Sequence, residues 1–150
     1  MNRRLALCVI APLVCAPSAA AAVKPLPGFH SPTGNITCLF VLPGERVLCS
    51  ITHAGYAPAL QDRCLNPHGE MGAGVDWHGW SLSRTGRATV NCSGGIQYDE
   101  RTFRPTYVTL PYGRTMRHFG ITCWSRVTGV TCRNPRGHGV FVSRATWRAW

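Results

Sequence analysis

The stretch FGITCWSRVTGVTCRNPRGHG, residues 119–139, predicts a β-hairpin that is closed by a disulfide. Residues two apart share one strand face over residues 121–125, and again over residues 130–132 after a break that contains Gly129. This two-residue period is typical of a half-buried strand. A loop over residues 126–129 places Cys123 opposite Cys132. Directly opposed residues have Cα atoms about 4.5 Å apart, within the range that a disulfide spans. The spacing therefore permits a bridge across this hairpin.

A second hairpin is predicted over residues 35–52, NITCLFVLPGERVLCSIT. Apolar residues alternate in both halves, and a turn centred on Pro43-Gly44 opposes Cys38 to Cys49. An L-proline followed by glycine does not form the favoured two-residue hairpin turn, so a bulge or a longer loop remains open here. The same bridging arrangement is thus expected twice in the chain.

The start of the chain has the features of a secretory signal peptide. Two arginines, a short apolar run and a tract of alanines follow one another over residues 1–22. The apolar run is about half as long as the roughly 20 residues that a membrane span needs. We expect cleavage between Ala20 and Val23, which leaves a single domain over residues 23–150. Cys15, which follows a valine, leaves a lipid anchor open as an alternative.

Two of the eight cysteines lie in the predicted signal peptide, which leaves six in the mature domain. An even number in an exported chain of this size is typical of a disulfide framework. By elimination Cys64 pairs with Cys92, which ends a third hairpin with its turn over residues 84–87. Zinc is the alternative, but the short C-x-x-C spacings of zinc and redox sites do not occur. We therefore expect three disulfides: Cys38–Cys49, Cys64–Cys92 and Cys123–Cys132.

The remaining segments also have short strand-like patterns. Residues 106–110 and 139–143 are brief runs of strand-forming residues. Ser143 is expected to cap a final helical turn, which would place Trp147 and Trp150 on one face. No other stretch has a helical period of useful length. These features predict an all-β fold, a small disulfide-bridged sandwich or barrel of short antiparallel hairpins.

The mature domain is basic. It retains fourteen of the sixteen lysines and arginines and all six acidic residues, and nine arginines follow the last acid, Glu100. Such a balance can attract anionic polymers such as nucleic acid or envelope polyphosphate. Arginine far outnumbers lysine, a bias that a GC-rich genome also produces, so a solvated strand face is the competing interpretation.

Four stretches of the mature chain form a specific pattern: FHSPTGNITC (29–38), LPYGRTMRHFGITC (110–123), TGVTCRN (128–134) and GHGVFVSR (137–144). In order and in cysteine placement they resemble a family of small exported bacterial proteins that is defined only as a domain of unknown function. The resemblance extends from about Phe29 to Arg144. It implies a signal peptide and a six-cysteine domain, and it supplies no activity, cofactor or catalytic residue. The family's acidic residue after Cys92 is missing, because this chain has Ser93-Gly94-Gly95 there.

Five residues of the 119–139 stretch are candidates for anion binding: Trp124, Arg126, Arg133, Arg136 and His138. Strand alternation divides the arginines between two faces and puts Arg133 on the same side as Trp124. We expect an exposed basic patch beside Trp124 that binds an anionic envelope polymer or an acidic protein. No groove-reading motif is present, so sequence-specific recognition of nucleic acid is not expected.

Catalysis and metal binding find little support in the sequence. The spacing of the six histidines does not match a metal-binding motif, and we therefore expect no metal or other cofactor. These histidines are His30, His53, His68, His78, His118 and His138. A small nuclease-like secreted hydrolase that uses Glu, His and Arg is the alternative function, and its glutamate would be Glu45, Glu70 or Glu100. The sequence favours a secreted or periplasmic, non-catalytic binding or envelope-associated domain.

Overall fold

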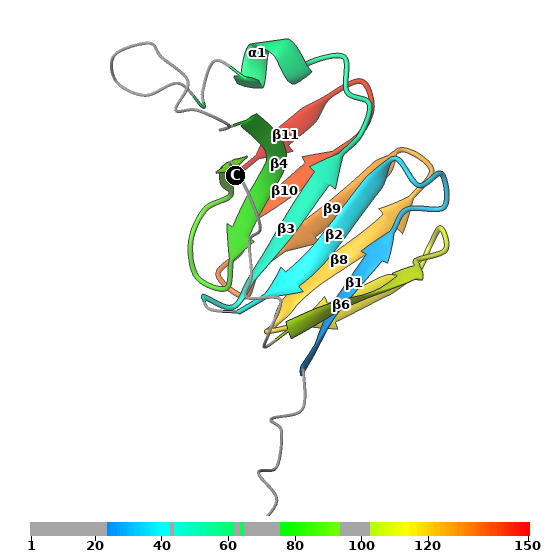
Figure 1. Ribbon diagram of the computed structural model, residues 1–150, viewed down its shortest axis with the longest axis vertical. Coiled ribbons are helices and arrows are strands. Elements are labelled where there is room, and N and C mark those ends of the chain that lie inside the picture. Colours follow the sequence, from blue (N-terminus) through cyan, green and yellow to red (C-terminus); the bar gives the residue numbers. More distant parts are fainter. Residues whose placement is uncertain (1–23, 43, 62–63, 65–75, 94–102) are drawn as a thin grey trace, which may run out of the picture.

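The computed structural model describes residues 24–42, 44–61, 64, 76–93 and 103–150. The predicted signal peptide and Cys15 lie outside the described residues, as do Glu70 and Glu100. The described residues form eleven strands and one short helix (Figure 1): β1 (Lys24–His30), β2 (Ile36–Val41), β3 (Arg46–Ile51), α1 (Ala57–Gln61), β4 (Asp76–Ser83), β5 (Thr89–Ser93), β6 (Phe103–Thr109), β7 (Thr115–His118), β8 (Ile121–Arg126), β9 (Gly129–Arg133), β10 (Gly139–Val142) and β11 (Trp147–Ala149).

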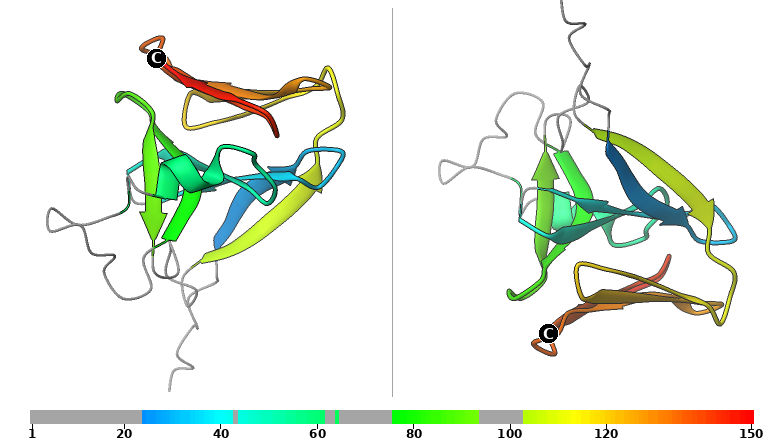
Figure 2. Two further views of the ribbon diagram at one scale, coloured as in Figure 1. Left: turned by 90° about the horizontal axis from the view of Figure 1, so that it is seen from above. Right: turned by 90° about the horizontal axis from the view of Figure 1, so that it is seen from below.

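The strands form two sheets that pack face to face (Figure 2). The first sheet has six strands in the order β5-β4-β3-β2-β1-β6, and the second has five in the order β11-β10-β9-β8-β7. Each neighbouring pair in the second sheet is antiparallel and consecutive in sequence. In the first sheet β6 returns to lie parallel to β1, a non-local pairing that we did not predict. The predicted all-β sandwich is confirmed.

The structure contains the three predicted disulfides: Cys38–Cys49, Cys64–Cys92 and Cys123–Cys132. In the two short hairpins the bridged cysteines lie directly opposite each other, with Cα atoms 4.1 and 4.0 Å apart. The third hairpin, β4–β5, also forms around the predicted turn, with Trp80 opposite Val90. Local alternation and turn position were therefore sufficient to predict the registers of the two short hairpins.

The turns differ in detail from the prediction. Arg126 pairs with Gly129, so the β8–β9 loop contains two residues rather than four. Gly129 has a φ of 144°, and a Cβ there would lie 2.4 Å from the carbonyl oxygen of Val142. A side chain at this position would collide with β10, which explains the glycine. In the β2–β3 hairpin Val41 pairs with Arg46, so the loop is longer than two residues, which is one of the two alternatives that the Pro-Gly sequence allowed. Glu45 in this loop has a φ of 42°.

The prediction of a final helical turn is wrong, because the last residues form strand β11, which pairs with β10. Ser143 does cap a turn: its Oγ accepts a hydrogen bond from the backbone N–H of Thr146 (3.1 Å). That turn reverses the chain onto the edge of the sheet instead of starting a helix. In a strand Trp147 and Trp150 point to opposite faces. Trp147 packs inward against Trp80, with ring centroids 4.4 Å apart.

The main core lies between the sheets, and the helix α1 adds Leu60 to it from a connection in which we predicted no helix. A second apolar cluster lies on the other side of the first sheet: Leu26, Leu39, Val41 and Leu48. Phe103 of β6 packs against this cluster. In Figure 2 the first sheet curves strongly, and its two edges turn away from the second sheet. The first sheet is therefore apolar on both faces, as expected for doubly covered strands.

Candidate functional site

The second sheet has one buried face and one open face. In β8 the residues Ile121, Cys123 and Ser125 are buried, and those between them are at least partly exposed. No element in the described part of the chain covers the open face, which forms one outside surface of the sandwich (Figure 2). We call it the outer face. Its side chains are Thr115, Arg117, Thr122, Trp124, Arg126, Thr131, Arg133, Phe141, Arg148 and Trp150.

Strand register arranges the outer face in two rows that cross the strands. One row consists of Thr115, Trp124, Thr131, Phe141 and Arg148. The other consists of Arg117, Thr122, Arg133 and Gly139. Directly opposed side chains in antiparallel strands have Cβ atoms about 4.5–5.5 Å apart. The rows therefore interleave arginines with aromatic rings and threonines across the whole sheet.

The last residue of the chain completes the second row. The backbone groups of Trp150 and Gly139 exchange two hydrogen bonds, and the indole covers the glycine so closely that a Cβ there would lie 2.5 Å from the ring. The indole N–H donates to the carbonyl oxygen of Gly137 (2.9 Å). The guanidinium carbon of Arg148 lies 5.3 Å from the ring centroid, within the range of a cation–π contact. Sequence reasoning missed this aromatic residue, because it assigned Trp150 to a helix.

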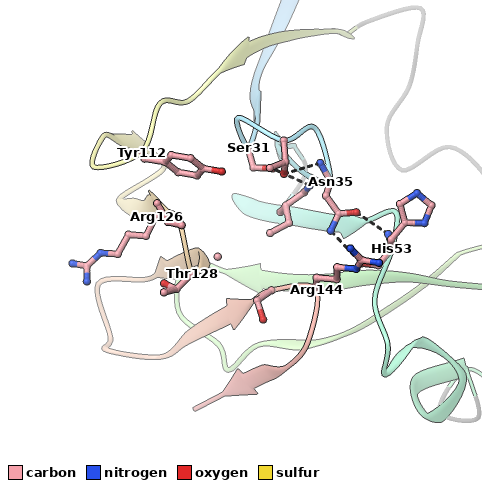
Figure 3. Close-up of a pocket in the computed structure, with 12 residues that line it drawn as sticks. Ser31, Asn35, His53, Tyr112, Arg126, Thr128 and Arg144 are labelled. Carbon is pink, nitrogen blue, oxygen red and sulfur yellow. Dashed lines mark hydrogen bonds between the residues drawn. The ribbon is translucent and has the colours of Figure 1, made fainter.

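The five predicted anion-binding residues are spread over the length of the second sheet. Trp124 and Arg133 lie on the outer face, on neighbouring strands. Arg126 lies at the hairpin end of β8, and its guanidinium points away from the cavity that the residue helps to line (Figure 3). Arg136 and His138 belong to the turn between β9 and β10, at the opposite end of β9. The five-residue β9 separates these ends by about 17 Å, so the five residues do not form one compact cluster.

Asn134 holds the β9–β10 turn against the first sheet. Its side chain is buried, and its Nδ2 donates to the carbonyl oxygens of Ser83 (2.9 Å) and Gly86 (2.7 Å). Its Oδ1 accepts from the backbone N–H groups of Arg136 (3.0 Å) and His138 (3.1 Å). One amide thus joins the β9–β10 turn to the β4–β5 turn. A buried asparagine of this kind has no sequence signature beyond its place before a proline.

The charge on the outer face is not neutralised locally. Arg117, Arg126, Arg133 and Arg148 are exposed, and no acidic residue follows Glu100 in the chain. Within the described ranges the sole ion pair joins Arg84 to Glu45, at 2.8 Å, and the hydrogen bond to that carboxylate raises the pKa of Arg84. Arg136 lies near this pair, because the three side chains line one shallow cavity. The outer-face arginines therefore remain available to an anion.

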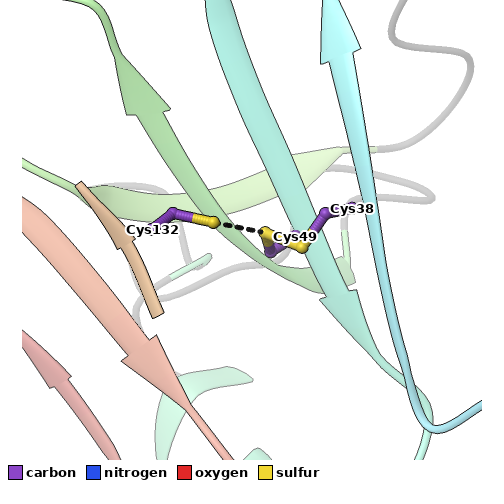
Figure 4. A group of neighbouring side chains, drawn as sticks. All are labelled: Cys38, Cys49 and Cys132. Atoms are coloured by element: carbon purple, nitrogen blue, oxygen red, sulfur yellow. Dashed lines mark hydrogen bonds between the residues drawn. A yellow bond between two sulfur atoms is a disulfide. The ribbon is translucent and has the colours of Figure 1, made fainter. Parts of the chain in front are cut away.

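A compact group of sulfur atoms lies between the sheets (Figure 4). The Sγ atoms of Cys38, Cys49 and Cys132 lie within 4.8 Å of one another, as metal ligands would. All three are disulfide-bonded, so they carry neither a proton nor the thiolate charge that a metal binds. The 3.7 Å contact between Cys49 and Cys132 is accordingly a van der Waals contact between two disulfides. The group is part of the core.

The residues required by the hydrolase alternative are not assembled in the described part of the structure. Glu45 is ion-paired with Arg84, and no histidine lines the cavity beside it. The other two candidate glutamates lie outside the described residues. No specific observation favours catalysis.

Comparison with known proteins places the chain in a family without assigning an activity. No curated protein and no solved structure matches it. No helix in the described residues is long and apolar enough to cross a membrane. The all-β fold with three disulfides agrees with the pattern of motifs read from the sequence. The chain belongs to a family of unknown function (DUF6636), which matches residues 7–148.

Proposed function

We propose that this protein is an exported, non-catalytic domain that binds an anionic envelope polymer through the outer face of its second sheet. One observation carries the proposal: arginines and aromatic rings alternate from strand to strand across a face on which no acidic side chain is found among the described residues. The three disulfides support export, since such bonds persist in oxidising compartments.

The spacing of the charges fits a linear polyanion. Arg117 and Arg133 lie in one row on β7 and β9, two strands apart, which is about 10 Å. Arg148 lies on β11, two strands beyond β9. Guanidinium groups form paired hydrogen bonds with phosphate oxygens. A face with evenly spaced guanidiniums can therefore contact successive charged units of one polymer.

Salt dependence provides the test. Three phosphate contacts predict that log K falls with log salt concentration with a slope of about −2 to −3. Binding of a fluorescent polyphosphate would be measured against ionic strength, with uncharged dextran as the neutral polymer. Arg117→Gln combined with Arg133→Gln is expected to weaken binding at least tenfold at low salt and to reduce the slope by about 1.4–1.8. Arg126→Ala combined with Arg133→Ala tests the hairpin end in the same assay.

A matched control removes the same charge elsewhere. Arg87 and Arg104 are exposed and belong to the first sheet or its turns. Their double glutamine variant is expected to leave both affinity and slope close to wild type, and equal losses in the two double variants would disprove a localised site. Poly-glutamate is compared at equal charge, and tighter binding to it than to polyphosphate would assign an acidic protein as the partner instead.

A further inference from the structure

A cavity of about 320 Å³ lies at the end of the sandwich where loops from both sheets meet (Figure 3). The first sheet contributes the β1–β2 turn and the residue His53 beyond β3. The second sheet contributes the β8–β9 hairpin and the segment after β10, and Tyr112 comes from the link between the sheets. Binding pockets for small organic molecules begin at about this volume. The cavity borders the outer face at Arg126 but opens between the loops at the end of the sandwich.

The wall of the cavity combines an apolar surface with one cation. Ile36 and Val127 are apolar lining residues, and Val127 is 80% exposed. The hydroxyl of Tyr112 points into the space from one side, and the side chain of Arg144 lies beside Asn35 on the other (Figure 3). Although Arg126 is also a lining residue, its guanidinium is directed away. No carboxylate lines the cavity. The available charge is therefore a single guanidinium.

Backbone and side-chain hydrogen bonds hold these loops in place. The amide of Asn35 donates to the carbonyl oxygen of His53 (3.1 Å) and accepts from its backbone N–H (2.8 Å). The buried Ser31 hydroxyl accepts from the N–H of Ile36 (3.1 Å). The carbonyl oxygen of Arg144 accepts from the N–H of Gly55 (3.0 Å), which ties the base of that side chain to the opposite sheet. A cavity whose walls are already ordered binds a ligand without the cost of ordering loops.

We propose that this cavity binds a small organic acid, in which one carboxylate is attached to a ring. Arg144 would hold the carboxylate by charge-assisted hydrogen bonds. The ring would lie against Ile36 and Val127, and the Tyr112 hydroxyl would contact a polar substituent at the far end of the ligand. A single ring with a carboxylate and a hydroxyl fits the size, the single positive charge and the apolar wall. The site does not depend on polymer binding by the outer face.

The probes are 4-hydroxybenzoate and its uncharged analogue 4-hydroxybenzamide, titrated into the disulfide-bonded protein. Binding would be followed by NMR through the methyl groups of Ile36 and Val127, with the core methyls of Ile121 as an internal reference. We expect saturable shifts at the two lining residues with 4-hydroxybenzoate, and weaker binding of the amide.

Two arginine variants separate the proposal from a general charge effect. Arg144→Gln is expected to weaken binding of 4-hydroxybenzoate about 10- to 100-fold, which corresponds to a lost charged hydrogen bond, and to leave binding of the amide unchanged. Arg126→Gln removes the same charge from a neighbouring lining residue that points outward, and it should have little effect on either probe. Tyr112→Phe should weaken both probes, because both carry the polar substituent that its hydroxyl contacts.

The proposal fails if wild type shows no saturable shift with the acid, or if Arg126→Gln and Arg144→Gln reduce its binding equally. Both arginines are exposed, so neither substitution should unfold the protein. The polyphosphate assay distinguishes this failure from failure of the outer-face site, since Arg144→Gln should leave polyphosphate binding close to wild type.

Discussion

The two cysteine hairpins begin with the same tripeptide and end in different environments. Strand β2 reads Ile-Thr-Cys-Leu-Phe-Val, and β8 reads Ile-Thr-Cys-Trp-Ser-Arg. Both bury the isoleucine and the cysteine, and both cysteines are bonded to the next strand. After the cysteine β2 is buried on both faces, whereas β8 continues to alternate. The inner faces hold the sandwich together, and the second sheet keeps one face exposed to solvent.

The largest expected contrast is between Leu39 and Trp124, which directly follow the cysteines of these two strands. Leu39 belongs to the apolar cluster under the curved first sheet, and Trp124 lies half-buried on the outer face. Leu39→Ala should lower the free energy of unfolding by about 2–5 kcal/mol, because it leaves a cavity. Trp124→Ala should lower it by about 1 kcal/mol or less. Denaturant unfolding measures both, and equal losses would mean that the outer face is covered.

Removal of the disulfides tests whether the two hairpins are equivalent. The chain-entropy model assigns about 2–4 kcal/mol to each bridge, and the two hairpin bridges span 11 and 9 residues. Replacing either pair of cysteines by alanine should therefore destabilise the protein by similar amounts. The Cys64–Cys92 bridge spans 28 residues, so its loss should cost about 1 kcal/mol more. A much larger loss for one hairpin would show that its strands pair poorly without the bridge.

The connection between the two sheets can be broken at Asn134. Asn134→Ala removes four hydrogen bonds and leaves two carbonyl oxygens of the first sheet without their donor. We expect the free energy of unfolding to fall by about 2–3 kcal/mol. Asn35→Ala is the matched control, because its two hydrogen bonds are exposed, and it should cost about 1 kcal/mol. If both variants lost the same stability, burial of the Asn134 amide would not be the cause.

The smallest expected effect is a pH dependence at Tyr56, whose hydroxyl donates to the carbonyl oxygen of Ser143 (3.0 Å) and so links the two sheets. Burial raises the pKa of Tyr56 to about 12, from an ordinary value of 10.0. The folded state holds this proton more tightly than the unfolded state, so its contribution is complete below pH 10 and is lost as the pH rises towards 12. Tyr56→Phe should remove the decline in unfolding free energy that the Tyr56 proton causes between pH 10 and 12. If the variant kept the pH profile of wild type, Tyr56 would not be the group responsible.

The sequence by itself determined the parts of the fold that depend on neighbours along the chain. Alternation of apolar residues and the positions of turns predicted both hairpin registers, and these paired the cysteines correctly. The same alternation separated Trp124 and Arg133 from the buried cysteines beside them. Such features are local, because a strand and its hairpin partner lie within about ten residues and the pattern of each decides which face is buried.

Only the tertiary structure decided the features that depend on distant segments. The last residues have a spacing that suits a helix, but the open edge of β10 offered backbone hydrogen bonds, and pairing there sent Trp147 into the core and Trp150 to the outer face. The parallel return of β6, the amide of Asn134 and the cavity beside Arg144 likewise join residues that are far apart in sequence. Local sequence patterns do not predict such contacts, because these contacts stabilise the protein only after distant segments have packed together.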